Sequence, residues 1–199
     1  MDLNILENTL MRAFSVGRYS IWSDYQKAGI MLMVDEGLRV SDMLKLTWQN
    51  VSNDGRIIVR QGKNSATLVV TPRFYSEVWR RFAVSKASMC YYLNYMQIYR
   101  MFRDLGLSLE EHENGNASVT HIGRKLVARE VYRVANDIND SAAALGHKST
   151  RSTQYYIRKR GASNRGNVLN SDLPLDGGLV VCKNAVVKLK ATRKKKRLK

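Results

Sequence analysis

The chain has 199 residues, 44% of them hydrophobic and 25% charged, so it is long and apolar enough to form a globular domain with its own core. Lysine and arginine total 33 against 17 acidic residues; the formal charge of +16 favours a polyanionic partner, with nucleic acid ahead of an anionic membrane or a role in solubility alone. We expect no membrane span, because no apolar run reaches about 18 residues, and the N-terminal segment does not have the pattern of a secretion signal. The two cysteines, Cys90 and Cys182, are too far apart for a zinc site and are expected to be free thiols.

The first predicted helix covers residues 24–36, where apolar side chains recur near helical spacing. Gly37 follows it and suits a left-handed cap at the helix end. A second helix is predicted to begin near Ser41 and to turn Met43, Leu44 and Leu46 inward.

A small antiparallel sheet is predicted next. Residues 48–51 are typical of a short strand and residues 53–55 (NDG) of a turn. Residues 57–59 and 67–70 have the pattern of two paired strands, joined by a polar connector at residues 61–65.

The rest of the chain is predicted to be mainly helical. One face after Pro72 carries Tyr75, Val78, Trp79 and Phe82, and a less regular one carries Met96, Tyr99, Met101 and Phe102. Residues 110–118 predict a polar loop, 122–138 and 141–145 predict helices, and 161–178 are loop-like. Four tyrosines (Tyr91, Tyr92, Tyr95 and Tyr99) are either a base-stacking surface or packing residues, and packing is favoured. The predicted fold class is α+β, mainly α, with one small antiparallel sheet.

Four separated segments carry side chains suited to phosphate chemistry. In chain order they are EGLRVSDMLKL (36–46), RQGK (60–63) between the two predicted strands, HIGR (121–124), and LGH (145–147) with Tyr156 nine positions later. Each segment alone has an ordinary structural explanation: Arg39 as an ion-pair partner of Asp42, Lys63 as a solvated turn residue, and either histidine as a buried helix cap.

Together and in this order, the segments resemble the tyrosine recombinases, also called the phage-integrase family. They are similar to the family's GLR-x-S-E-L-x-x-L box (with Asp42 in place of the usual glutamate), its lysine-bearing hairpin, its H-x-x-R box and its LGH…Y segment. The resemblance extends over residues 37–156, most of the chain. It implies that Arg39 binds the scissile phosphate and that Lys63, His121, Arg124, His147 and Tyr156 complete the catalytic set.

Phosphodiester cleavage explains these residue types. Attack on phosphorus places charge on the non-bridging oxygens, and the forked donors of Arg39 and Arg124 can stabilise that charge. Tyr156 is the nucleophile in this scheme and must lose its proton, for which His121 is the candidate base. Lys63 is the candidate acid for the leaving 5′-oxygen, and His147 would donate a hydrogen bond to the phosphate. We expect neither a metal nor a nucleotide cofactor.

Two positions depart from a simple match. Lys125 stands after Arg124, where the family often has histidine. Tyr155 and Tyr156 are adjacent, and the spacing from His147 favours Tyr156 as the nucleophile, with Tyr155 as the alternative.

The predicted domain organisation is a catalytic domain at residues 1–165, followed by a C-terminal docking segment and basic tail at residues 166–199. The first box begins too early in the chain to leave room for the N-terminal DNA-clamping domain that most members of the family carry. In this respect the chain resembles the compact recombinases or a truncated integrase. Residues 179–187 are apolar enough to dock on a neighbouring copy or to form a last core strand. Residues 183–199 hold nine basic residues and no acidic residue, so the rest of the chain carries a formal charge of +7 out of the total of +16. This tail either contacts phosphates or is a solvated arm.

The predicted function is site-specific recombination of double-stranded DNA through a 3′-phosphotyrosyl bond, by a dimer or tetramer on DNA. The predicted location is the cytoplasm, with DNA, or a host cell if the chain is viral. The alternatives are a non-cutting DNA-binding regulator of the same fold, or a telomere resolvase or type IB topoisomerase with the same chemistry.

Overall fold

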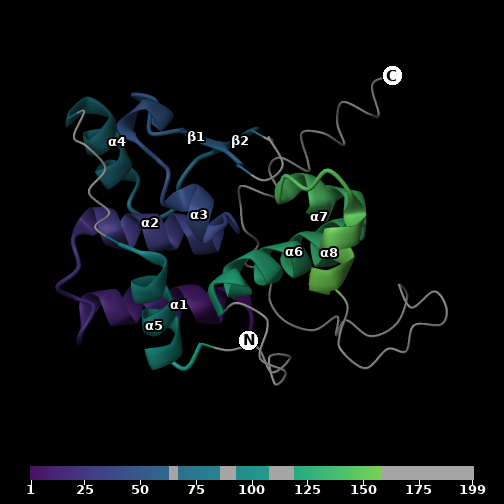
Figure 1. Ribbon diagram of the computed structural model, residues 1–199, viewed down its shortest axis with the longest axis horizontal. Helices are drawn as coiled ribbons and strands as arrows, with labels where there is room; N and C mark the ends of the chain where they lie inside the picture. The colour runs from purple at the N-terminus through teal and green to yellow at the C-terminus, as the bar shows by residue number, and fades with distance from the viewer. Residues whose placement is uncertain (63–66, 86–92, 108–118, 158–199) are drawn as a thin grey trace.

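The computed structural model describes residues 1–62, 67–85, 93–107 and 119–157 (Figure 1). Lys63, the loops predicted at 110–118 and 161–178, and the docking segment and basic tail lie outside the described residues. Within the described part, helices predominate and one two-stranded antiparallel sheet lies at the edge of the molecule, which confirms the predicted fold class. No described helix is both long and apolar enough to cross a membrane.

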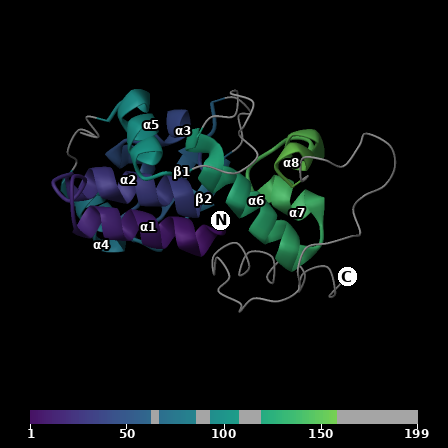
Figure 2. The same ribbon diagram turned by 90° about the horizontal axis from the view of Figure 1, so that it is seen from below.

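Two N-terminal helices, α1 (Leu3–Ser15) and α2 (Asp24–Asp35), lie side by side (Figures 1 and 2). Helix α1 is not among the elements predicted from the sequence. The predicted α2 is confirmed: a reciprocal capping box between Ser23 and Gln26 starts it, and Gly37 adopts a positive φ of 62° after its end. Residues 28–35 of α2 are all buried, because α1, α3, α4 and α6 pack around this helix.

The segment after α2 forms α3 (Val40–Met43), the 3₁₀ helix η1 (Trp48–Asn50), and strands β1 (Ile57–Arg60) and β2 (Thr67–Val70). The two predicted strands pair as expected, with Ile57 opposite Val70. The strand predicted at residues 48–51 is wrong. The Asn50 side chain accepts a hydrogen bond from the backbone N–H of Thr47 at 2.8 Å, which closes a helical turn and leaves only Val51 to form an isolated bridge.

Helices α4 (Ser76–Ser85) and α5 (Tyr95–Asp104) follow β2. The predicted α4 face is confirmed for Val78, Trp79 and Phe82, which are buried; Tyr75 lies just before the helix. The predicted α5 face is wrong at Met96, which is 49% exposed. Ile98 takes the buried position beside Met101 and Phe102, because these three positions lie on one side of the helix.

The C-terminal part contains η3 (Val119–His121), α6 (Ile122–Ala135), α7 (Ile138–Ala144) and α8 (Thr150–Ile157), and α6 contacts both α7 and α8. The single helix predicted over 122–138 is interrupted, because Asn136 is left-handed (φ 50°) and Asp137 caps α7. Gly123 lets α6 cross α2 closely: a Cβ there would lie 2.9 Å from the Cα of Val34. This crossing brings the H-x-x-R box against the end of α2.

Candidate functional site

Arg39 lies just after the turn that ends α2. Its side chain is only 15% exposed, and its Nη1 lies 3.1 Å from Oε1 of Gln61 and 3.5 Å from Oδ2 of Asp42. The ion pair with Asp42 considered above is therefore present. Asp42 is itself buried and accepts a hydrogen bond from the backbone N–H of Gly62 at 3.2 Å, so the arginine box and the end of β1 are joined.

Arg124 lies in the interior on α6 and is 1% exposed. Nη1 donates to the carbonyl of Gly37 at 2.6 Å, and Nη2 lies 2.7 Å from the carbonyl of Leu145 and 2.8 Å from Nε2 of His147. Nε has no hydrogen-bond partner within the described residues. Two backbone carbonyls, one at the end of α2 and one at the end of α7, therefore orient the guanidinium. Within the described residues, no carboxylate is hydrogen-bonded to it.

The charge of Arg124 is poorly compensated. Its pKa is lowered from 12.5 to about 10, first by burial and then by the nearby charge of Arg39, while the Tyr156 hydroxyl and the Asp42 carboxylate act in the opposite direction. The guanidinium therefore stays protonated at neutral pH. The buried Arg124 and the largely buried Arg39 are two cations close together, so an anion binds favourably between them.

His147 lies between Arg124 and α8. Its Nε2 must accept the hydrogen bond from Arg124, because a guanidinium has only donors; the ring proton is then on Nδ1, which lies 2.8 Å from Oγ1 of the buried Thr153. Burial lowers the pKa of His147 from 6.5 to about 4, with contributions from Arg124 and Arg39, so the ring is neutral at pH 7. In this arrangement Nε2 accepts, and the predicted donation to a phosphate requires a proton to reach it.

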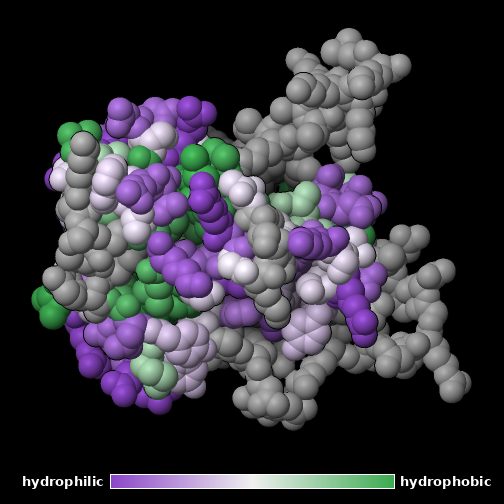
Figure 3. Space-filling view, turned by 45° about the horizontal axis from the view of Figure 1, so that its top comes forward, coloured by the Kyte–Doolittle hydropathy of each residue, from purple (hydrophilic) through white to green (hydrophobic). Residues whose placement is uncertain are grey.

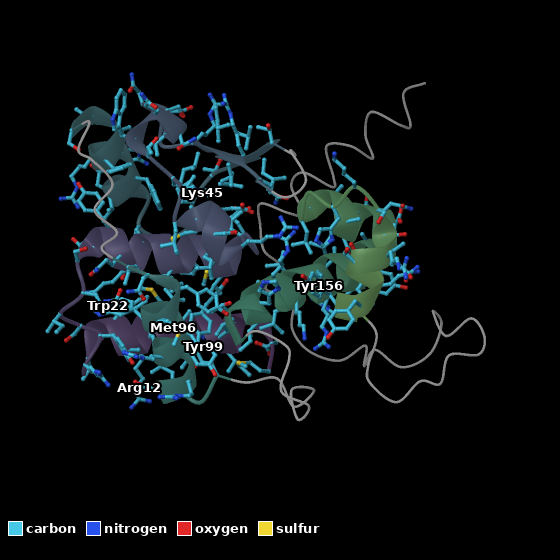
Figure 4. The ribbon with its side chains drawn as sticks, in the orientation of Figure 1. Arg12, Trp22, Lys45, Met96, Tyr99 and Tyr156 are labelled. Atoms are coloured by element: carbon cyan, nitrogen blue, oxygen red, sulfur yellow. The ribbon has the colours of Figure 1, made fainter. Side chains whose placement is uncertain are left out.

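Tyr156 is half-buried on α8, with its ring packed against the core (Figure 4). Its hydroxyl lies 3.4 Å from Nδ1 of His121, and its backbone carbonyl accepts a hydrogen bond from Nε of Arg129 at 3.0 Å. Tyr155 is 66% exposed, and its ring faces the ammonium of Lys125 at 5.5 Å. Of the two adjacent tyrosines, Tyr156 is the one whose hydroxyl is directed toward the other predicted site residues.

Five of the six predicted site residues lie together: Arg39, His121, Arg124, His147 and Tyr156. The sixth, Lys63, lies outside the described residues. Gly62, directly before it, is hydrogen-bonded into the arginine box, and a Cβ on Gly62 would lie 3.4 Å from Nζ of Lys45. Lys45, which the sequence analysis did not single out, is an exposed cation above α3 (Figure 4).

Two buried polar residues of the site were also missed. Thr153 holds the His147 ring, and Gln61, 1% exposed, contacts Arg39. Gln61 had a usable signal: Ile57, Val59 and Gln61 follow the two-residue period of a strand, which directs all three inward, and a buried amide must find partners. Thr153 had none that we recognise.

The arrangement can bind a phosphate diester and direct a tyrosine hydroxyl at it. Two guanidinium groups face one buried carboxylate, Asp42, so the site carries excess positive charge. The described residues include no group of three or more histidine, cysteine, aspartate or glutamate side chains that could hold a metal ion. The face seen in Figure 3 is largely hydrophilic, with hydrophobic residues in separate small groups.

The fold defines the class: it is that of the catalytic domain of tyrosine recombinases. One similar solved structure is that of the XerH site-specific recombinase bound to difH substrate, a pre-cleavage complex (TM-score 0.59, 19% identity, 81% of this chain and 51% of that chain). Another is a lambda integrase dimer bound to a COC′ core site (TM-score 0.52, 18% identity, 85% of this chain and 49% of that chain). The chain spans about half the length of these proteins.

The chain belongs to the phage integrase family, whose family model matches residues 7–162. This match confirms the family that the four sequence boxes resemble. No curated protein matches the sequence.

Proposed function

We propose that this chain is a site-specific tyrosine recombinase that cleaves and rejoins double-stranded DNA through a 3′-phosphotyrosyl bond at Tyr156. One observation carries the proposal: the Tyr156 hydroxyl lies beside His121 and Arg124, in a site where two arginines face a single carboxylate. Membership of the phage integrase family supports it.

In the proposed reaction, the Tyr156 oxygen attacks the scissile phosphorus and forms a new P–O bond. The tyrosine proton passes to Nδ1 of His121, 3.4 Å away in the free site. Arg39 and Arg124 donate to the non-bridging oxygens as charge builds on them. The bond to the 5′-oxygen breaks, and Lys63 supplies the proton to this leaving group. Rejoining is the same sequence reversed, and the phosphotyrosyl bond retains the energy of the phosphodiester, so no nucleotide is consumed.

The proposed partners are double-stranded DNA and further copies of this chain, as a dimer or tetramer. The solved relatives support this, since XerH is described bound to difH and lambda integrase as a dimer on a core site. Residues 166–199 would supply docking and phosphate contacts, and the protein would act wherever its target DNA lies.

The test is covalent capture on DNA. Because no target site is assumed, the substrate is a pool of nicked duplexes with a randomised centre, in which the nick lets the short leaving strand diffuse away. We expect adducts on a denaturing gel, with protein on the 3′ end, that persist in excess EDTA. Tyr156→Phe should abolish the adduct with little change in DNA affinity, because one hydroxyl is lost and no charge changes; Tyr155→Phe is the matched control.

Other outcomes identify the alternatives. DNA binding without any adduct supports the non-cutting regulator. Adducts that relax supercoiled plasmid without sequence preference support a type IB topoisomerase, and hairpin ends support a telomere resolvase. Cleavage that vanishes with chelator, returns with magnesium and leaves free 3′ ends contradicts the tyrosine mechanism altogether.

A further inference from the structure

We infer that Gln61 is a positioning residue that fixes the distance and orientation between the two arginines of the site. The inference rests on the proposed function, because it assigns Gln61 a part in orienting Arg39 for phosphodiester cleavage. Nothing in the sequence boxes assigns this residue a role.

Gln61 connects three separate segments through its side-chain amide. Oε1 accepts a hydrogen bond from Nη1 of Arg39 at 3.1 Å, and Nε2 donates to the carbonyl of Leu145 at 3.0 Å. The same carbonyl accepts from Nη2 of Arg124 at 2.7 Å. A continuous chain of three hydrogen bonds therefore runs from one guanidinium to the other, through one amide and one backbone carbonyl.

The chemistry of the partners fixes the orientation of the amide. A guanidinium can only donate, so it must face Oε1, and a carbonyl can only accept, so it must face Nε2. Glutamine meets both requirements at this length. A glutamate would still accept a hydrogen bond from Arg39 but would repel the Leu145 carbonyl. A methionine of similar length would make neither of the two hydrogen bonds.

Packing holds the amide in this place. Gln61 is 1% exposed, and the backbone of Gly146 lies directly against it: a Cβ on Gly146 would come within 2.8 Å of Oε1. On the other side, Gly62 is hydrogen-bonded to Asp42. The amide cannot turn away without breaking contacts with both neighbouring segments, so it restrains Arg39 in one direction.

Restraint is needed here because the two guanidiniums repel each other, and the only ion pair of Arg39 within the described residues, with Asp42, is long at 3.5 Å. Without Gln61, Arg39 would lose its shorter hydrogen bond and move away from Arg124. Both arginines must face the same phosphorus, so such a movement lowers the rate of the chemical step more than the affinity for DNA.

The experiment measures single-turnover cleavage and DNA affinity for Gln61→Met, alone and combined with Arg39→Ala. We expect Gln61→Met to lower the cleavage rate roughly 10- to 100-fold, with affinity within about three-fold of wild type. In the Arg39→Ala background the same change should cost less than about three-fold, because the residue that Gln61 positions is already gone. The exposed Gln49→Met is the matched control and should cleave like wild type.

Gln61→Glu gives a second, independent readout if Gln61→Met folds poorly. Near neutral pH the introduced carboxylate should slow cleavage, because it repels the Leu145 carbonyl and pairs with Arg39, which draws Arg39 away from the phosphate. When protonated, it has one donor and one acceptor like an amide, so its rate relative to wild type should recover as the pH falls.

The inference is overturned if Gln61→Met cleaves within three-fold of wild type, or if its loss is as large in the Arg39→Ala background. It is also overturned if the relative rate of Gln61→Glu does not depend on pH. Failure of the proposed function is a different result, in which the wild-type chain itself forms no adduct.

Discussion

Two buried arginine clusters lie close to the C-terminal end of α2, and their charge balances are opposite. The candidate site has two guanidiniums, Arg39 and Arg124, against one carboxylate. The second, here called the acidic cluster, has one guanidinium, Arg73, against two carboxylates: Asp35 at 3.0 Å and Glu7, which is in direct contact. Glu7 comes from α1 and Asp35 is the last residue of α2, four positions before Arg39.

The two clusters resolve their imbalance differently. In the acidic cluster, the pKa of Glu7 is raised from 4.5 to about 7, mainly by burial and in smaller part by the neighbouring Asp35, while Arg73 acts in the opposite direction. Burial also raises the pKa of Asp35. The excess negative charge is thus removed by a proton. The site cannot remove its excess positive charge in this way, because arginine keeps its proton; among the described residues no further carboxylate balances it, so a bound anion would be stabilised there. The two clusters therefore differ in how their charge is balanced. The acidic cluster takes up a proton, whereas the excess positive charge of the candidate site favours binding of an anion.

The largest effect is expected from removing an arginine of the site. Arg39→Ala and Arg124→Ala should each lower single-turnover cleavage by about 10³-fold, near the upper end for one oxyanion donor, because each guanidinium carries a full charge. DNA affinity should fall much less. A loss of only a few-fold in cleavage rate would show that the arginine is structural, and the claim that the candidate site binds a phosphate while the acidic cluster does not would then be wrong.

Removing Arg73 should instead affect folding. Arg73→Met leaves two buried carboxylates without their cation and should lower the free energy of unfolding by about 3 kcal/mol at pH 8. The loss should be smaller at pH 5, where Glu7 is protonated. Denaturant titration at both pH values measures this, and cleavage by the folded fraction should stay within three-fold of wild type. A large loss of cleavage with unchanged stability would contradict the assignment of Arg73 to the scaffold.

The proton in the acidic cluster predicts a pH-dependent stability. The pKa of Glu7 is higher in the folded chain than in the unfolded chain, so its favourable contribution is complete below about pH 4.5 and is lost as the pH rises through about 7. The free energy of unfolding should fall by about 1–3 kcal/mol between pH 5 and pH 8. Glu7→Gln, which resembles the protonated acid, should flatten this slope and be the more stable protein at pH 8; an unchanged slope would assign the effect elsewhere.

The smallest effect concerns His147, whose ionisation DNA binding should change. Its pKa is about 4 partly because Arg124 and Arg39 repel its proton, and a bound phosphate would offset that repulsion. The pKa should therefore rise on binding, and affinity should increase by less than ten-fold from pH 7.5 to pH 6. Fluorescence anisotropy with His147→Gln as the control measures this; an equal slope in both proteins would exclude His147 as the source.

Most of the site could be predicted from the sequence, and the acidic cluster could not. Arg39, His121 and Tyr156 belong to boxes with recognisable spacing, which is local information. Glu7 and Arg73 are far apart in the chain and form no motif; they meet because α1 packs against α2 and because Arg73, in the segment after β2, pairs with Asp35 at the end of α2.

The errors in the fold have a similar origin. Helix α1 is absent from the elements predicted from the sequence, although its Leu6 and Leu10 have helical spacing and are buried. The strand predicted at residues 48–51 failed because one side chain, that of Asn50, bonds back to Thr47 and closes a turn. The pattern of hydrophobic residues specifies which faces are buried, but such local hydrogen bonds decide how the chain turns between them.

The backbone bonds of Arg124 bear on how such a protein tolerates sequence change. Its guanidinium is oriented by the carbonyls of Gly37 and Leu145, which belong to the main chain and survive any substitution that preserves its path. Selection on this arginine therefore acts on the course of two helix ends rather than on partner side chains. The residues that cannot drift are the glycines that permit those turns: Gly37 and Gly146 have φ values of 62° and 64°, and a Cβ on either would come within 2.9 Å of a neighbouring side chain. A chain can thus keep this arginine in place while the side chains around it are free to change, and solved structures at 18–19% identity share the fold.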